Sequence, residues 1–227
     1  MQQRNAARCG NMKGKVAGAW SGYHLRSKRI GALLPVYSSV MQKPFEIETI
    51  AWQELQRDRL FPLLTPAQCE FYVTAAMEIG AREAAQYRGE PILPLVEKLG
   101  ACLEDYEDCD GGNMIAGSEI YAEYDAVYRR IRLHRVGVSR LAARLGQALP
   151  EAAAKQTAWD LLAAHELFHH LEATRLGPVH TKLPPIAIPV LRGLWRVQRR
   201  VLRTREIAAH SFAYTLLGMA ERFDTRG

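Results

Sequence analysis

The stretch that decides the fold lies in the second half of the chain and reads Trp159-Asp-Leu-Leu-Ala-Ala-His165-Glu166-Leu-Phe-His169-His170-Leu-Glu172. It contains the motif HExxH as His-Glu-Leu-Phe-His. Residues four apart on a helix lie one turn apart on the same face, so His165 and His169 can direct their imidazoles to a single metal ion. Glu166 borders that face, where its carboxylate can hold a water molecule and accept its proton. The motif therefore predicts a helix that carries a catalytic metal site.

The residues around the motif predict that this helix is buried. Most of them are apolar, namely Leu161, Leu162, Ala163, Ala164, Leu167, Phe168 and Leu171. Three ionisable groups on one face of a buried helix cost stability unless they are paired or bound to a metal. A structural cluster of paired histidine and glutamate side chains is the ordinary alternative. The apolar flanks favour the metal site.

A catalytic zinc ion needs a third protein ligand and one open position for water. The downstream candidates are Glu172, His180, Glu206 and His210. Glu172 is too near on the same helix to complete a tetrahedron, and His180 lies in a proline-rich segment that would hold it less firmly. Glu206 begins a segment of small and apolar residues at helical spacing, which lets two helices approach closely. We therefore favour Glu206 as the third ligand.

Two residues after Glu206 are candidates for stabilising the oxyanion of a transition state. His210 lies one helical turn after Glu206, and Tyr214 lies two turns after it, so both reach the same side of the helix. Each can donate a hydrogen bond to developing negative charge. His210 can equally act as a hydrogen-bonding partner of the metal ligands.

The remaining periodicity predicts an α+β fold that is mostly helical. Apolar residues recur at helical spacing over residues 52–87, with breaks at Pro62 and Pro66, and Thr65 has the position of a helix N-cap. Alternating residues predict a small antiparallel sheet, with strands at residues 119–124 and 128–134 around a turn near Asp125. Residues 109–117, with three glycines, are expected to form a loop. Further helices are predicted at residues 91–99, 138–149, 151–176 and 190–222.

Composition limits the classes of partner. The 227 residues are 48% hydrophobic and 24% charged, with a net charge of +6. Residues 1–40 hold seven of the 30 basic residues and no acidic residue, so the rest of the chain has 23 basic residues against 24 acidic ones. The folded part is therefore close to neutral, and a nucleic-acid partner is not expected.

We expect a single domain over residues 41–227, preceded by a flexible basic tail over residues 1–40. An organelle-targeting segment and a natural start at Met41 are alternatives for that tail. No run of apolar residues is long enough to cross a membrane, and we expect no membrane partner. The four cysteines show no CxxC pairing, and no secretory leader precedes them, so we expect a cytoplasmic protein.

The HELFH helix followed by E-x-A-A-x-x-F-A-x-x-L-L, which begins at Glu206, resembles the ImmA/IrrE family of zinc metallopeptidases. The segment from Pro91 to Gly100 is similar to a short helix of that family, and residues 122–133 lie where the family has its small sheet. The resemblance covers roughly residues 75–220. Two departures are a longer gap between His169 and Glu206 and a histidine at position 210, where the family has a small polar residue.

The resemblance implies a minimal zincin-like core, in which the HExxH helix packs against a second helix that bears a glutamate. It implies Zn²⁺ bound by His165, His169 and Glu206, with Glu166 as the general base. The expected function is that of a selective endopeptidase that acts on a protein or peptide substrate, such as a regulatory protein.

Two other functions remain open. The arginine series from Arg192 to Arg205 predicts an amphipathic helix with a solvated basic face, which could recruit an acidic partner. On that basis the chain could be a non-catalytic, zinc-stabilised binding module. Glu166 and His169 also form an ExxH unit of the kind found in di-iron helical bundles, but the chain has no second ExxH.

Overall fold

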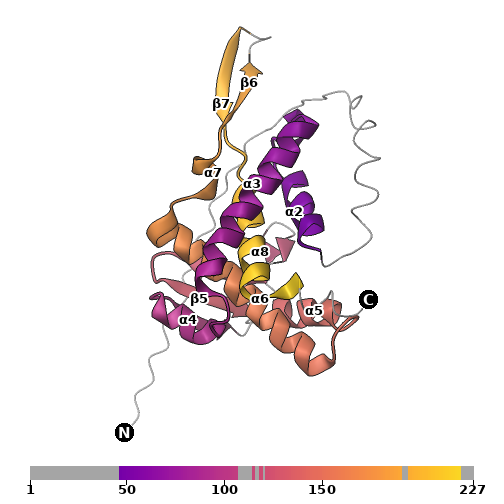
Figure 1. Cartoon of the computed structure of the whole chain (residues 1–227), viewed down its shortest axis with the longest axis vertical. Coiled ribbons are helices and arrows are strands. Elements are labelled where there is room, and N and C mark those ends of the chain that lie inside the picture. The colour runs from indigo at the N-terminus through magenta and orange to yellow at the C-terminus, as the bar shows by residue number, and fades with distance from the viewer. Residues whose placement is uncertain (1–45, 107–113, 116–117, 120, 191–193, 221–227) are drawn as a thin grey trace, which may run out of the picture.

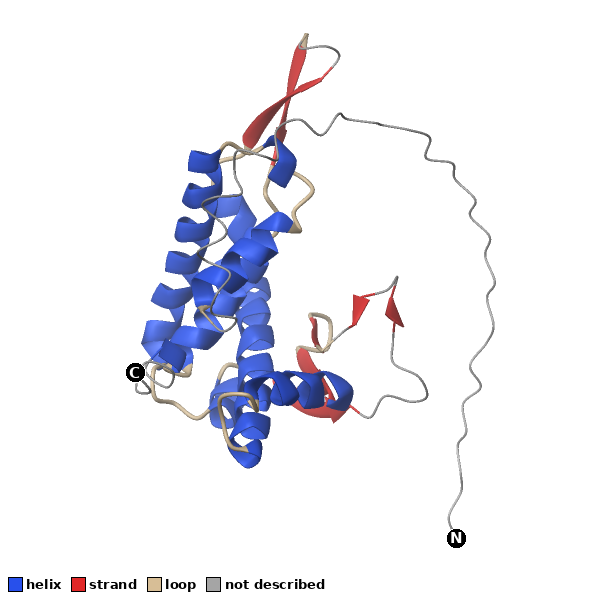
Figure 2. Cartoon of the chain, turned by 90° about the vertical axis from the view of Figure 1, so that its right-hand side faces the viewer, coloured by secondary structure: helices blue, strands red, loops and turns tan. Residues whose placement is uncertain are grey.

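The computed structural model describes residues 46–106, 114–115, 118–119, 121–190 and 194–220. This part of the chain is mostly helical, with a small mixed sheet on one side and a two-stranded hairpin that projects from one end (Figures 1 and 2). The predicted tail over residues 1–40 and most of the predicted loop over residues 109–117 lie outside the described residues.

Helix α3 (Pro66–Ala84) begins where the sequence predicts. Thr65 is its N-cap: the Thr65 hydroxyl accepts from the backbone N–H of Gln68 at 3.3 Å, and the Gln68 side chain accepts from the backbone N–H of Thr65 at 2.9 Å. This reciprocal capping satisfies two backbone donors that the first helical turn leaves without partners. Helix α2 (Ile47–Gln56) precedes α3, and a short 3-10 turn, η2 (Phe61–Leu63), joins them.

Helix α8 (Thr204–Leu216) occupies the centre of the fold, where it packs against α2, α3 and α6. Gly80 of α3 allows this close packing, because a Cβ atom at that position would lie 2.1 Å from the carbonyl oxygen of Ala208. On its other side α8 meets the helix of the HExxH motif, where the fully buried rings of Phe168 and Phe212 stand 5.5 Å apart. The small residues of α8 therefore let α3 and α6 pack closely against it. The sequence predicts such a close approach between two helices.

Helix α6 (Glu151–Leu171) confirms the predicted helix that carries the motif. A single π-helical turn, η4 (Glu172–Leu176), extends it, and Gly177 ends it with a positive φ of 71°. The predicted helices at residues 91–99 and 138–149 correspond to α4 (Ile92–Lys98) and α5 (Arg135–Leu145). Within the described part of the chain, no helix has the length and hydrophobicity needed to cross a membrane.

The two predicted antiparallel strands are confirmed as β4 (Ala122–Asp125) and β5 (Arg130–His134), but the sheet is mixed, because a third strand that was not predicted pairs parallel with β5. Strand β5 is central; it pairs antiparallel with β4 and parallel with β1 (Cys102–Tyr106). Ile131 and Leu133 of β5 are fully buried. The sequence did not reveal β1 because two of its residues are acidic, which is unusual for a strand. A second small pair consists of β2 (Met114–Ile115) and β3 (Ser118–Glu119).

The prediction of one continuous helix over residues 190–222 is also wrong. After the short helix α7 (Val179–Lys182), the chain forms β6 (Ile186–Val190) and β7 (Trp195–Arg199), which pair antiparallel, and α8 starts only at Thr204. Apolar and polar residues alternate along β7 from Trp195 to Gln198. The strand period therefore prevails, and the predicted helix with a basic face from Arg192 to Arg205 does not form.

Candidate metal centre

The three predicted metal ligands converge although they come from helices far apart in the sequence. His165 and His169 project from α6, and Glu206 projects from the first turn of α8. One potential ligand atom of each lies within 4.8 Å of the other two. The Oε2 atom of Glu206 stands 3.3 Å from His165 Nε2 and 3.5 Å from His169 Nε2. The packing of α8 against α6 thus completes a group of three ligands.

The two separations from Glu206 to the imidazoles match edges of a tetrahedral zinc site. Zinc–nitrogen and zinc–oxygen bonds are about 2.0–2.2 Å long, so the edges of the tetrahedron between ligand atoms are about 3.3–3.6 Å long. Both edges from Glu206 to the imidazoles fall in that range. The chemistry of the donors fits as well, since two imidazoles and one carboxylate are a common ligand set of catalytic zinc.

Glu172 fixes the orientation of the His169 ring. Its carboxylate, of which only 2% is exposed, accepts a hydrogen bond from His169 Nδ1 at 2.9 Å. A carboxylate only accepts, so Nδ1 carries the proton, and the lone pair of a neutral ring must lie on Nε2, which faces Glu206. The carboxylate also accepts from the backbone N–H of Val179 at 2.8 Å and from Arg205 Nε at 3.0 Å.

Glu172 was considered from the sequence as a metal ligand, and its role in orienting the His169 ring was not predicted. The signal was its position three residues after His169, because a helix brings such a pair side by side. Arg205 was predicted to lie on a solvated face, but it contacts Glu172 and is the residue immediately before Glu206. The side chain of Glu172 therefore connects both ligand-bearing helices.

Glu166 lies among the ligands and is itself buried. Burial raises the pKa of its carboxyl, while His165 and His169 oppose that shift and Glu206 adds to it. These interactions place the Glu166 carboxylate in the electrostatic field of all three ligands. A raised pKa suits a group that must accept a proton at neutral pH.

The ligands are strongly coupled to one another. Burial alone would lower the pKa of His169, but hydrogen bonds with Glu172 and Glu206 outweigh it and raise the pKa to about 10. Burial alone would raise the pKa of Glu206, but hydrogen bonds with His165 and His169 hold it well below its usual range. The Nδ1 atom of His165 is buried and makes no hydrogen bond to the described residues.

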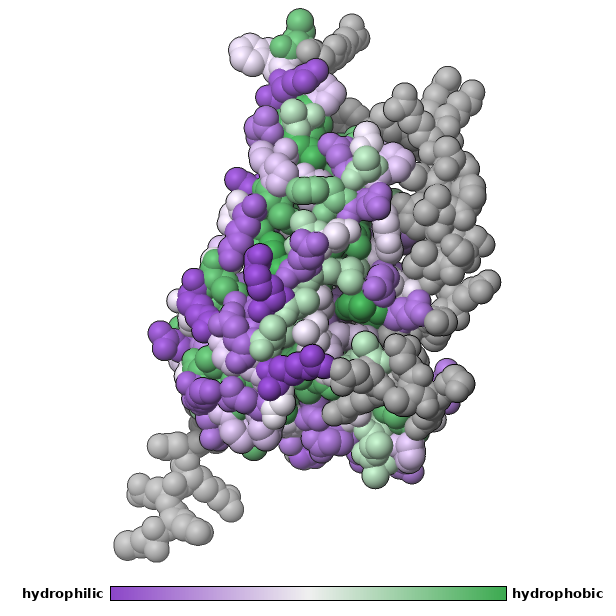
Figure 3. Space-filling model, viewed as in Figure 1, coloured by the Kyte–Doolittle hydropathy of each residue, from purple (hydrophilic) through white to green (hydrophobic). Residues whose placement is uncertain are grey.

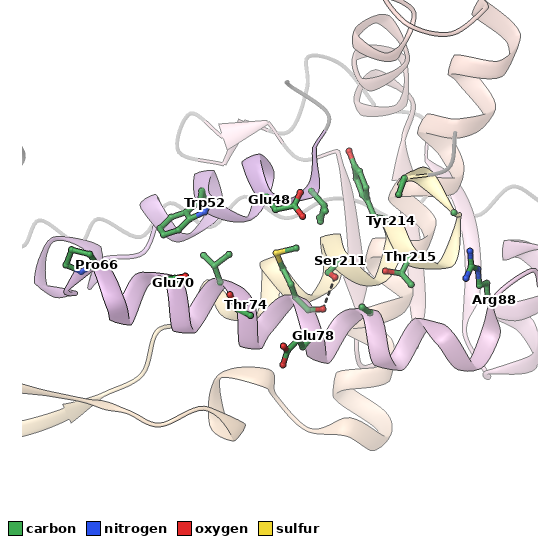
Figure 4. A pocket seen from close by; sticks show the side chains of 16 residues that line it. Glu48, Trp52, Pro66, Glu70, Thr74, Glu78, Arg88, Ser211, Tyr214 and Thr215 are labelled. Carbon is green, nitrogen blue, oxygen red and sulfur yellow. Dashed lines mark hydrogen bonds between the residues drawn. The ribbon is translucent and has the colours of Figure 1, made fainter. Parts of the chain in front are cut away.

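The structure separates the two predicted oxyanion donors. The ring of His210 stands 4.5 Å from the ring of His165, and burial holds the pKa of His210 well below its ordinary value. Tyr214 instead lines a pocket of about 860 Å³ between α2, α3 and α8, together with Trp52 and Ser211 (Figure 4). None of the three metal ligands lines this pocket. His210 is therefore the better placed of the two.

His170, the residue after the motif, has a structural role. Its Nε2 donates to the carbonyl oxygen of Leu99 at 3.0 Å, so its Nδ1 accepts from the hydroxyl of Tyr124 at 2.9 Å. Burial lowers the pKa of His170, which keeps the ring neutral. The ring thus links α6 to β4 and to the end of α4, and so holds the motif helix against the sheet. His180, the other candidate ligand, lies on α7, outside the group of three.

The chain was compared with protein-family models, with curated proteins and with solved structures, and none of the three comparisons gives a match.

Proposed function

We propose that this chain is a zinc-dependent peptidase with a minimal zincin-like core, of the kind found in the ImmA/IrrE family that its sequence resembles. The observation that carries the proposal is the convergence of His165, His169 and Glu206, with Glu206 at 3.3 and 3.5 Å from the two imidazoles, as in a tetrahedral zinc site. Glu166, the residue adjacent to the first ligand, is buried in their electrostatic field.

Each residue then has a distinct role in peptide hydrolysis. Zn²⁺ bound by the three ligands would supply a Lewis acid that polarises the attacking water and the scissile carbonyl. The carboxylate of Glu166 accepts a proton from that water and delivers it to the leaving nitrogen, so it acts first as a base and then as an acid. Neutral His210 donates a ring N–H toward the developing oxyanion. Glu172 acts on none of these atoms and keeps Nε2 of His169 directed at the site.

The proposed substrate is a protein or peptide, and the resemblance suggests selective cleavage of a regulatory protein. The proposed compartment is the cytoplasm, which suits the free thiols of Cys69 and Cys102. The alternative of a non-catalytic, zinc-stabilised binding module was based on a helical basic face, whereas residues 186–190 and 195–199 form strands. It also gives Glu166 no function.

The first test is the metal content of the full chain, purified without a histidine tag and measured by inductively coupled plasma mass spectrometry. We expect about one zinc ion per chain, and a His165→Ala variant should lose it because two ligands hold zinc poorly. A mixture of peptides from digested cell protein then reports cleavage by mass spectrometry.

The mechanism is tested by Glu166→Gln, which should retain zinc but lose activity about 10²- to 10⁴-fold, because the amide cannot accept the proton. Glu97→Gln is the matched control, since Glu97 is exposed on α4. Retained cleavage by Glu166→Gln would contradict the assigned base. A protein that takes up no zinc even in excess would overturn the whole proposal.

A further inference from the structure

The β6–β7 hairpin projects from the body of the molecule (Figures 1 and 2); we call residues 186–190 and 194–199 the hairpin arm. Its base is fixed to the body. Arg200 Nη1 donates to the carbonyl oxygens of His180, Thr181 and Leu183 at 2.9–3.0 Å, and the Tyr72 hydroxyl donates to that of Pro184 at 2.7 Å. An isolated two-stranded hairpin is marginally stable, so a projecting one with a fixed base calls for an explanation.

The hairpin arm has one largely apolar face that loses its cover toward the tip. Residues directly opposite each other in an antiparallel pair share a face, and the register pairs Ile188 with Val197, while the exposed Arg199 lies opposite Ile186 at the base. At the base, Ile186 is only 7% exposed. At the tip, Leu194 is 82% exposed and Trp195 is 67% exposed. Figure 3 shows hydrophobic side chains at the end of the arm, next to strongly hydrophilic ones.

The segment of chain that contains the arm is basic. The 33 residues between Glu172 and Glu206 contain eight basic residues and no acidic one. Four of the basic side chains are engaged by the body: Arg175 by Glu83, Arg200 by backbone carbonyls, Arg203 by Glu54 and Arg205 by Glu172.

The cations left for a partner lie on and beside the arm. Lys182, Arg196 and Arg199 are exposed, and no carboxylate in the described part of the chain pairs with them. The tip therefore combines an exposed tryptophan and leucine with neighbouring cations that are free to contact anionic groups.

We propose that the hairpin arm is a surface anchor for an anionic lipid bilayer, which inserts Leu194 and Trp195 among the headgroups and brings Arg196 and Arg199 to the phosphates. Tryptophan favours the membrane–water interface, and each cation near an anionic membrane adds attraction. A nucleic acid would bind the cations but leave the apolar tip in water. The expectation of no membrane partner came from the lack of a spanning segment, which does not bear on a surface anchor.

The test is co-sedimentation of the full chain with vesicles of phosphatidylcholine containing about one third phosphatidylserine, at about 0.1 M salt. Leu194→Ser with Trp195→Ser leaves every charge in place and should lower the partition coefficient about tenfold or more. Arg196→Gln with Arg199→Gln should lower it about 30-fold, since each cation contributes about one kcal/mol near such a surface.

Matched controls separate the arm from the general basicity of the chain. Arg59→Gln with Lys155→Gln makes the same change in charge at exposed positions on the body, and should change binding much less than the arm variant. The thermal midpoint and zinc content should stay the same in all three variants, because every substituted side chain is exposed. The vesicle experiment therefore tests the arm independently of the proposed peptidase activity.

Three results would overturn the proposal. The first is vesicle binding that does not change in the Leu194→Ser, Trp195→Ser variant. The second is a chain that binds duplex DNA or polyglutamate but not vesicles, and whose binding falls equally in both arm variants. This result would indicate a polyanion site. The third is a dimer in light scattering that the apolar variant abolishes, which would indicate a surface for a second copy of the chain.

Discussion

Gly80→Ala tests whether the close contact of α3 with α8 builds the metal centre. A Cβ atom at position 80 would lie 2.1 Å from the carbonyl oxygen of Ala208 and 2.9 Å from the backbone nitrogen of Phe212. Carbon–oxygen contacts are normally no shorter than about 3.3 Å, so the two helices must separate by about 1.2 Å. No rotamer change can relieve this contact, because the atoms on the α8 side belong to the backbone.

Overpacking of a core costs about 1–3 kcal/mol, and the rigid neighbours of Gly80 place this substitution at the upper end. Alanine recovers roughly 1 kcal/mol through its higher helix propensity. We therefore expect a net loss of about 2 kcal/mol, which lowers the thermal midpoint by about 4–8 °C for a domain of this size. Circular dichroism at the helical wavelength measures that midpoint.

Gly146→Ala is the control for this experiment. Gly146 ends α5 with an ordinary φ of −61°, and a Cβ there would approach no atom closer than the carbonyl oxygen of Ala142 at 3.3 Å. Its midpoint should change by less than about 2 °C. The Gly80 variant should also bind zinc more weakly, because the shift of α8 moves Glu206. Equal midpoints for the two variants would refute the argument that the α3–α8 contact has no spare room.

Two further substitutions test single interactions. Glu172→Gln keeps a hydrogen-bonding side chain beside His169 but removes the charge, so zinc affinity should fall about 10- to 100-fold in a competition with a fluorescent chelator. Unchanged affinity would show that Glu172 does not orient the His169 ring. Thr65→Ala removes the acceptor for the backbone N–H of Gln68 and should lower the free energy of urea unfolding by about 1 kcal/mol, whereas Thr65→Ser should restore it.

The sequence predicts which residues come together at the candidate site better than it predicts the path of the chain around it. His165, Glu166 and His169 are linked by local helical geometry, so a correct helix assignment already places them on one face. Glu206 could be predicted because small residues at helical spacing indicate close helix packing, and α8 packs against α3 and α6 in this way. The position of Tyr214 could not be predicted in this way: its helical turn is as expected, but the surroundings of its side chain depend on how α2 covers α8.

The two errors in secondary structure have different physical origins. In β1, paired strands tolerate Glu104 and Asp105 because both side chains keep access to solvent, so tertiary pairing overrides a poor intrinsic preference. In β7, the arginines suggested one face of a helix, yet Trp195 and Val197 already alternated with polar residues at the strand period. The second error was avoidable from the sequence, and the first required knowledge of the partner strand.

The contact between Arg200 and Leu183 has a consequence for the spacing of the two helices that meet at the candidate site. The chain departs from the body after Leu183 and returns at Arg200, whose side chain donates to the carbonyl oxygen of Leu183 at 2.9 Å. The arm therefore starts and ends at one place on the body. A change in the length of the arm is expected to leave the 3.5 Å separation between His169 Nε2 and Glu206 Oε2 unchanged.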